Sequence, residues 1–425
     1  MTQVRAASPA LSPLAEPTRK VGKRWIALIA LANLGLLLGY LAPLGVLLPN
    51  QVQAIAGSAH KVAALGWVTG IGAAVAMISS PVAGALSDRT TSRFGRRHPW
   101  TVCGALAGAA ALALLAGQHT IAGVIIGWCL AQAGLNAMQA SLTAGVPDHV
   151  PVAQRGAVSG WIGVAQTVSA VLAVALVTLA VTGNAGYVLI AALVMACALP
   201  FALTTPDARL PATDRPPFAW LEFARSFWLS PRQYPDFAWA WLTRLVVNVG
   251  NAMAVLYLLY FLRDRVHYSH LFPGQKAENG LLILTVVYTA GVVITAVTGG
   301  VISDRTGRRK LPVTVAGLVM AVPAVMLALW PTWPVALVSA ALMGLGFCAY
   351  LSVDQALITQ VLPSARARAK DLGILNIASY GARVLAPAIA APLVSQFGGY
   401  PALYLSAAAI TVLGSAFIWK IRSVR

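Results

Sequence analysis

Residues 84–90 read Gly-Ala-Leu-Ser-Asp-Arg-Thr, and the same order returns at residues 300–306 as Gly-Val-Ile-Ser-Asp-Arg-Thr. Paired arginines follow each copy, at positions 96–97 and 308–309. Each copy lies where one long apolar segment ends and another begins, so its charges are expected at a membrane–water boundary. The glycines are expected to let helices approach closely and to let the chain turn. A charge cluster that only sets orientation would need the arginines but not this repeated order.

This repeated pattern resembles the signature loop of major facilitator transporters, which joins helices 2 and 3 and again helices 8 and 9. The longer first copy, from Ser87 to Trp100, looks like that of the sucrose/glycoside–proton symporter branch. The resemblance implies a gate at the inner face, with Asp88 facing the start of segment 11 and Asp304 the start of segment 5. The gate residues it implies are Gly84, Asp88, Arg89, Arg96, Arg97, Gly300, Asp304, Arg305, Arg308 and Arg309.

The composition indicates a membrane protein. The sequence is 58% hydrophobic and 10% charged, whereas a soluble domain carries about 25% charged residues. All four cysteines fall inside apolar segments, which is typical of small buried side chains rather than of metal ligands or disulfides. The sequence shows no phosphate-binding loop, metalloprotease motif or other catalytic signature, so we expect no enzyme activity, no metal and no cofactor.

Segments long enough to span a bilayer recur along the chain. Their expected ranges are 25–48, 62–86, 100–118, 120–146, 157–182, 186–204, 237–262, 281–302, 311–330, 333–361, 371–396 and 400–419. Asp304 stands 216 positions after Asp88, and Gln355 and Gln139 keep the same offset. The sequence therefore predicts an all-α membrane protein of twelve transmembrane helices in two six-helix pseudo-symmetric halves, the major facilitator fold.

Charge and composition divide the rest of the chain. We expect an N-terminal tail at 1–24, halves at 25–204 and 237–419, a linker at 205–236 and a C-terminal tail at 420–425. An interfacial helix over residues 218–229 and a plain tether are both compatible with the linker. One set of loops holds nearly all lysines and arginines, and the other holds Lys61, Arg263, Arg265 and Lys276. The first set and both termini are therefore expected on the cytoplasmic side of a plasma membrane, facing anionic lipid, with no need for nucleic acid.

Polar residues recur at helical spacing within several spans, which places each set on one helix face. In major facilitators, helices 1, 4, 7 and 10 line the central cavity and helix 11 contributes, so the resemblance implies a substrate cavity. Interhelical hydrogen bonding is the alternative for each residue. The expected cavity residues are Asn33, Tyr40, Gln132, Asn136, Gln139, Asn248, Asn251, Tyr350, Asn376 and Tyr380. Nearby aromatic rings that would stack on a sugar are Trp161, Tyr257, Tyr288 and Tyr350.

Asp354 is the only carboxylate well inside any apolar span. Arg383 lies at comparable depth, and Arg244 lies a little nearer the end that holds the termini. An acid that alternates between an apolar environment and an arginine can take up and release a proton. We therefore predict Asp354, Arg383 and Arg244 as the proton-coupling set, with a static ion pair or a partner for Arg305 as alternatives.

The sequence as a whole predicts a secondary transporter, expected as a monomer, that moves a small polar solute by alternating access. A sugar or glycoside carried with protons is the leading substrate class. Segment 1 has no acidic residue, whereas the plant sucrose carriers place their coupling aspartate there. Motifs of drug–proton antiporters and of glucose-type porters are absent as well. Efflux of a drug-like metabolite is the first alternative, and a non-transporting sensor on the same scaffold is a remote one.

Cysteine labelling in intact cells tests the expected topology. In a variant without native cysteines, a cysteine at Ser92 or Ala365 is expected to react only with reagents that cross the membrane. A cysteine at Gly274 is expected to react with impermeant maleimide from outside. An odd number of expected spans separates Gly274 from Ser92 and from Ala365, so it lies on the opposite side of the membrane from both. Labelling of Ser92→Cys by the impermeant reagent would contradict the helix count or the orientation.

Overall fold

The computed structural model is built of helices. It describes residues 17–181, 183–214, 232–306, 310–361 and 368–421, and within these the side chains of 296–306, 310–313, 351–361 and 368–376, and that of Asp214, lie outside the description. The α-helices of the first part of the chain are α1 Lys23–Ala42, α2 Leu48–Asp88, α3 His98–Ala116, α4 Ile121–His149, α5 Val152–Ala175 and α6 Ala185–Thr204. Those of the second part are α8 Pro235–Leu256, α9 Leu258–Asp264, α10 Tyr268–Leu271, α11 Ala277–Thr306, α12 Lys310–Leu329, α13 Trp333–Val361, α14 Arg368–Ser395 and α15 Gly399–Phe417.

The helices match the expected spans to within a few residues at most ends. Among the described residues, nine stretches are long and apolar enough to cross a membrane, and the bent pair α8 and α9 makes a tenth. One of the nine, Lys23–Asp88, is broken at Gly57, where φ is +71°, and crosses twice. The shorter apolar helix Thr314–Leu329 completes the twelve that the sequence predicts. Residues 218–229, for which the sequence leaves an interfacial helix and a plain tether open, lie outside the described residues.

Local sequence explains where several helices begin and bend. The Thr120 hydroxyl accepts the backbone N–H of Gly123 at 3.1 Å and so caps α4. Pro99 stands in the first turn of α3, where a proline costs no helical hydrogen bond. After α1, the segment Pro43–Leu47 is π-helical, a local widening that often marks a functional region. This segment directly follows α1 and begins three residues after Tyr40, a predicted cavity residue.

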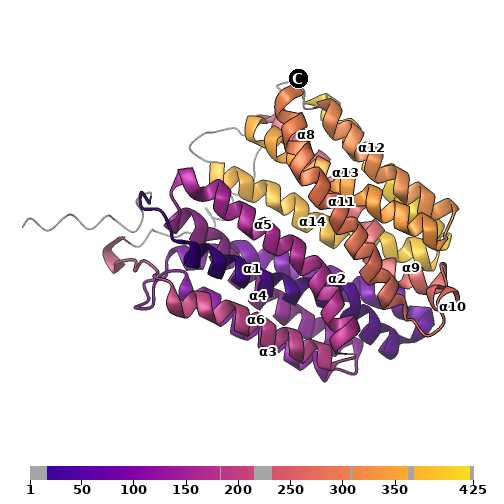
Figure 1. Ribbon diagram of the computed structural model, residues 1–425, viewed down its shortest axis with the longest axis horizontal. Coiled ribbons are helices and arrows are strands. Elements are labelled where there is room, and N and C mark those ends of the chain that lie inside the picture. Colours follow the sequence, from indigo (N-terminus) through magenta and orange to yellow (C-terminus); the bar gives the residue numbers. More distant parts are fainter. Residues whose placement is uncertain (1–16, 182, 215–231, 307–309, 362–367, 422–425) are drawn as a thin grey trace, which may run out of the picture.

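Helix packing repeats between the two parts of the chain. In the first part α1 packs against α5 and α6, and α4 packs against α2 and α3. In the second part α8 packs against α14 and α15, and α13 packs against α11 and α12 in the same way. The two parts meet through α2 with α14 and through α5 with α11, which are equivalent pairs under the repeat. Figure 1 shows the first six helices, indigo to magenta, beside the later ones, orange to yellow.

Glycines permit close approach within each part, but not where the repeated loop motif suggested. A Cβ on Gly134 of α4 would lie 2.5 Å from the backbone nitrogen of Gly108 on α3. A Cβ on Gly344 of α13 would lie 2.1 Å from the Tyr288 carbonyl on α11. Around Gly84 the nearest atom to an added Cβ is that of Ala140, at an ordinary 4.0 Å. The expectation of close approach at Gly84 is therefore wrong, because a methyl group at this position would make only an ordinary van der Waals contact with α4.

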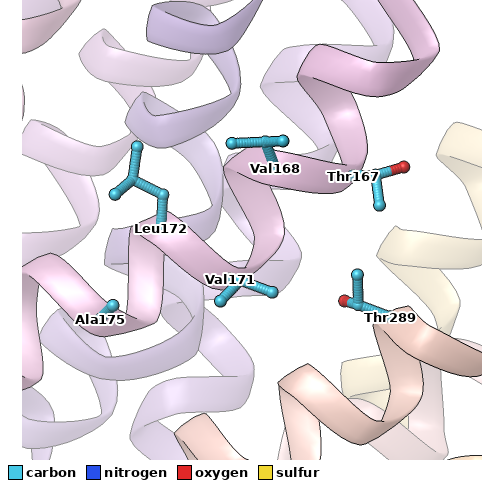
Figure 2. Close-up of a pocket in the computed structure, with 6 residues that line it drawn as sticks. All are labelled: Thr167, Val168, Val171, Leu172, Ala175 and Thr289. Carbon is cyan, nitrogen blue, oxygen red and sulfur yellow. The ribbon is translucent and has the colours of Figure 1, made fainter.

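A pocket of about 370 Å³ lies where α5 meets α11 (Figure 2). Its described lining is apolar apart from Thr167 and Thr289. The Thr167 hydroxyl donates to the Gly163 carbonyl of its own helix at 3.0 Å, so this threonine offers little to a polar ligand. The pocket therefore marks the apolar contact between the two parts rather than a site for a polar solute.

The glycine contact gives a stability prediction. Gly134→Ala is expected to lower the free energy of unfolding by about 1–3 kcal/mol, because the new methyl group overlaps backbone atoms that cannot move aside. Gly160→Ala on α5 is the matched control, since nothing lies within 4 Å of its added Cβ. The control is expected to be neutral or slightly stabilising, because alanine favours helix over glycine. Equal melting temperatures of the two variants in detergent would contradict the packing.

Candidate translocation site

A polar group from the first part of the chain meets polar groups from the second part near the middle of the bundle. Tyr40 of α1 is almost buried, and its hydroxyl donates to Gln139 Oε1 of α4 at 3.3 Å. The Tyr40 hydroxyl also lies within electrostatic range of Tyr380 and Arg383 on α14. Two predicted cavity residues are therefore hydrogen-bonded between α1 and α4. The predicted cavity residue Tyr380 and the predicted coupling residue Arg383, both on α14, lie within electrostatic range of Tyr40.

Arg383 is exposed although it lies near the midpoint of α14. It is 12 residues from the end of α14 at Ser395, or about 18 Å at 1.5 Å per residue. Among the described residues, Arg383 forms no hydrogen bond or ion pair. An arginine that faces hydrocarbon at this depth costs at least about 2.5–3.5 kcal/mol. Arg383 lies within electrostatic range of the Tyr40 hydroxyl, which is a polar group of the first part of the chain.

Arg244 occupies a different environment from Arg383. It is buried in α8, and its Nε donates to the Ser379 hydroxyl of α14 at 3.1 Å. Ser379 is one helical turn before Arg383, so both lie on one face of α14. Asn248 donates its side-chain amide to the Arg244 carbonyl at 2.7 Å. The predicted face of α8 therefore joins α8 to α14.

The predicted amides are partly satisfied by their own helices. Asn136 is 1% exposed and donates to the side chain of Gln132 at 3.0 Å and to its carbonyl at 2.8 Å. Asn33 donates to the Ile29 carbonyl at 2.8 Å. The side-chain oxygens of Asn136 and Asn251 are buried without a hydrogen-bond partner among the described residues. Such oxygens are positions where a water or solute hydroxyl could donate.

The four aromatic residues occupy separate environments. Tyr257 is fully buried and donates its hydroxyl to the Val62 carbonyl at 3.1 Å. Tyr350 is fully buried in an apolar cluster with Val247, Met320 and Ile418. Trp161 is exposed on α5 and Tyr288 is half-buried on α11. The structure therefore does not bring these rings together around one space.

The side chains of several predicted site residues lie outside the described part of the chain. Gly300, Asp304 and Arg305 lie on the last turns of α11, Asp354 lies on α13 and Asn376 lies on α14, with their side chains outside the described part of the chain. Arg308 and Arg309 lie outside the described residues altogether. The second gate and the coupling carboxylate stay predictions.

The first copy of the repeated motif forms an ion-pair network at the end of the bundle where α1 begins, called here the tail end. Arg97 binds Asp88 at 2.5 Å, Ser87 at 2.9 Å and Asp148 at 2.7 Å, while Arg96 binds Asp148 at 2.6 Å. Burial alone would lower the pKa of Arg97, but the carboxylates of Asp148 and Asp88 reverse this and raise the pKa. Arg97 therefore stays charged and ties α2 to the end of α4.

Asp207, which follows α6, adds a second anchor at the tail end. Its side chain is 2% exposed and accepts the backbone N–H groups of Arg97 at 2.6 Å and His98 at 2.9 Å. These N–H groups begin α3, so the carboxylate caps that helix and complements its dipole. Gly95 has a φ of +101°, and an added Cβ there would overlap the Asp207 carboxylate. The loop therefore needs glycine at this position.

The opposite end of the bundle, called here the far end, holds hydrogen bonds between the two parts of the chain. Lys61, itself 4% exposed, binds Asp264 at 2.7 Å, and Asp264 also accepts the Tyr400 hydroxyl at 2.7 Å. Tyr260 donates to the Pro49 carbonyl at 2.7 Å. Arg263 reaches Asn50, Gln53 and Glu278 as well. These contacts, called here the far-end lock, hold the two parts together on that side.

The sequence predictions missed Asp148, Asp207 and the whole far-end lock. Lys61 and Arg263 were recognised as rare basic residues of one loop set, and Glu278 and Asp264 stand near span ends in the same loops. The sequence did offer one signal for the far-end lock. The chain has only 12 acidic residues, so Asp264 and Glu278 were among the few carboxylates that could pair with Lys61 and Arg263.

Comparison with known proteins identifies the family. The sequence profile of the Major Facilitator Superfamily matches residues 34–283 and 274–425. The chain belongs to this superfamily of transporters. It is therefore a membrane-embedded transporter rather than an enzyme, and it has the fold that the repeated loops implied.

Individual similarities are more distant. The chain is 36% identical over 99 residues to the sucrose transport protein SUC4 of Arabidopsis thaliana, a match that covers 23% of this chain and 18% of that protein. A mutant of the nucleoside transporter NupG superposes with a TM-score of 0.76 at 13% identity, over 94% of this chain and 99% of that one. A POT family transporter in complex with a thioalcohol-conjugated peptide gives 0.75 at 11% identity, over 93% and 96%. Such low identities show the fold alone.

The far-end lock gives a conformational prediction. Asp264→Asn is expected to destabilise closure by about 1–3 kcal/mol, because it leaves the buried Lys61 ammonium without a carboxylate. Spin labels at Ser58 and Lys276, on the two sides of the lock, are expected to show a larger population at long distance. Arg265→Gln is the matched control at an exposed neighbouring residue. An unchanged distance distribution in Asp264→Asn would show that the lock does not hold the far end closed.

Proposed function

We propose that the chain moves a small polar solute of the carbohydrate class across the plasma membrane, coupled to protons. The observation that carries this proposal is the central set of Tyr40, Gln139, Tyr380 and Arg383, which spans both parts of the chain. Hydroxyl, amide and guanidinium groups are suited to binding a solute with many hydroxyls. The local likeness to a sucrose transport protein supports the same substrate class.

Alternating access would use the two ends of the bundle in turn. The far-end lock holds one side closed, and we propose that it breaks when the site opens there. The density of lysine and arginine supports placing the tail end, and both termini, in the cytoplasm. The Arg97 network would then stay within the first part of the chain throughout the cycle, because the described partners of Arg97 all belong to that part.

For the proton we propose Asp354, acting with Arg244 or Arg383. Asp354 lies 7 residues from the end of α13 at Val361, about 10 Å from the tail end. Protonation would be favoured where the carboxyl is surrounded by apolar groups, and release where a guanidinium approaches it. Arg244 and Ser379 already link α8 to α14 beside the central set, so small movements of these helices would change the environment of the acid.

Substitution of Asp354 tests the coupling in proteoliposomes. Asp354→Asn is expected to abolish accumulation of solute driven by a pH gradient while counterflow exchange continues, because exchange needs no net proton movement. Asp214→Asn, in the linker, is the matched control and is expected to retain both activities. Accumulation that persists in Asp354→Asn would overturn the coupling role, and loss of both activities would indicate a structural role instead.

A further inference from the structure

Two histidines at the tail end stand on either side of the buried Asp207 carboxylate. His98 of α3 has its Nδ1 at 3.9 Å from Asp207 Oδ2, and His149 of α4 has its Nε2 at 3.8 Å from Asp207 Oδ1. Both ring nitrogens are buried and form no hydrogen bond in the described part of the chain. Within that part, Asp207 therefore has a cation at ion-pair distance only when one of these histidines is doubly protonated.

The other nitrogen of each ring already donates to a backbone carbonyl, which settles where the first proton lies. His98 Nε2 lies 2.9 Å from the Thr205 carbonyl and 3.1 Å from the Thr205 hydroxyl. That hydroxyl donates its own hydrogen to a carbonyl of α6, so both oxygens act as acceptors for Nε2. His149 Nδ1 lies 3.0 Å from the Gly145 carbonyl. In its neutral form, each histidine therefore turns a lone pair toward Asp207.

His149 is the histidine that is better placed to hold the second proton. It is the last residue of α4, where the unpaired carbonyl groups of a helix favour a positive charge. Asp207 Oδ2, which faces His98, already accepts two backbone N–H groups. Asp207 Oδ1, which faces His149, accepts no hydrogen bond in the described part of the chain. A proton on His149 Nε2 therefore meets the oxygen that lacks a donor.

The charges of the network around Asp207 leave room for one such proton. Arg97 binds Asp88 and Asp148, and Arg96 binds Asp148 as well. These two arginines face three carboxylates when Asp207 is counted, so one doubly protonated histidine brings the network to neutrality. Burial makes an unbalanced charge costly.

The other groups that pack against the histidines do not replace this proton. Helices α1 and α6 present neutral rings, with Trp25 at 5.9 Å from His149 and Phe201 at 5.4 Å from His98 between ring centroids. Other charged residues of the described elements and loops at this end are exposed or half-buried: Arg19, Lys20, Lys23, Arg24, Arg89, Arg93, Arg155 and Arg209.

We propose that His149 and Asp207 form a pH sensor at the tail end, which sets how firmly the linker is held to the first part of the chain. This inference goes beyond the proposed transport and holds for any solute. Asp207 is the third residue after α6, and the next carbonyl, that of Ala208, accepts the Arg96 N–H at 3.2 Å. The start of the linker is therefore held against the start of α3.

The direction of the pH effect follows from the geometry. A doubly protonated His149 attracts the Asp207 carboxylate, whereas a neutral His149 turns a lone pair toward it. Histidine changes its charge between about pH 5 and 8. The linker is therefore expected to be held firmly at acid pH and to loosen as the pH rises through this range.

Labelling of a cysteine at Leu210 measures this attachment on the purified full-length protein in detergent, where both ends meet the same pH. Leu210 is 3% exposed, so a cysteine there is shielded while the linker is held. In a variant without native cysteines, the maleimide labelling rate of Leu210→Cys is divided by that of Arg209→Cys, an exposed neighbour. The ratio corrects for the general rise of thiol reactivity with pH. It is expected to increase by about 5- to 30-fold between about pH 5.5 and about pH 8.5.

Substitutions assign the pH dependence to the two residues. His149→Gln is expected to remove most of it, because glutamine takes up no proton in this range. Asp207→Asn is expected to give a high ratio at both pH values, because the carboxylate that holds the start of α3 is lost. His119→Gln, at an exposed histidine of the far end, is the matched control and is expected to keep the original profile. If His149→Gln does not fold, His149→Lys supplies a permanent cation and is expected to keep the ratio low at both pH values.

Three results would count against the sensor. A ratio that stays the same between the two pH values, while Asp207→Asn raises it, would show an attachment that pH does not control. A profile that is unchanged in His149→Gln but lost in His98→Gln would assign the proton to the wrong histidine. Loss of the profile in His119→Gln would show a general effect of pH on the fold. Because no solute is present, none of these results bears on the proposed transport.

Discussion

Hydrocarbon offers no partner to a charged group, and this constraint decides where the chain can place its charges. With 12 acidic residues against 30 lysines and arginines, carboxylates are scarce. In the part of the chain that the structure describes, Asp88, Asp148 and Asp207 gather at the tail end, and Asp264 and Glu278 at the far end. Both clusters join segments that are distant in sequence, so the few acidic residues stabilise the packing of the helices at the two ends of the bundle.

The two ends use their ion pairs differently. The described partners at the tail end belong to the first part of the chain, so that network can move as one body. The far-end contacts cross between the parts, as between Lys61 and Asp264, so they must break if the parts separate there. Close backbone contact at Gly134 and Gly344 stiffens each part internally. If the two parts move against each other, the contacts that change are those of α2 with α14 and of α5 with α11.

Hydropathy and the repeated loop were enough to predict the spans and the family, because both depend on local sequence. Helical spacing also predicts the polar faces that carry Tyr40 on α1 and Gln139 on α4. The hydrogen bond between these two residues becomes visible only in the fold, which places α1 beside α4. Spacing does not say what a face meets. Tyr350 is one turn from Asp354, yet its ring lies in an apolar cluster. Lys61 and Asp264 are 203 positions apart, and no local pattern joins them.

The position of Asp207 in the chain sets an order on assembly. Its carboxylate holds the start of α3, yet it is synthesised after all six helices of the first part. Until residue 207 leaves the ribosome, the first turn of α3 lacks its anionic cap, although Asp88 and Asp148 are already available to Arg97. The contact needs no residue of the second part, so the first part of the chain holds every group that anchors the start of α3.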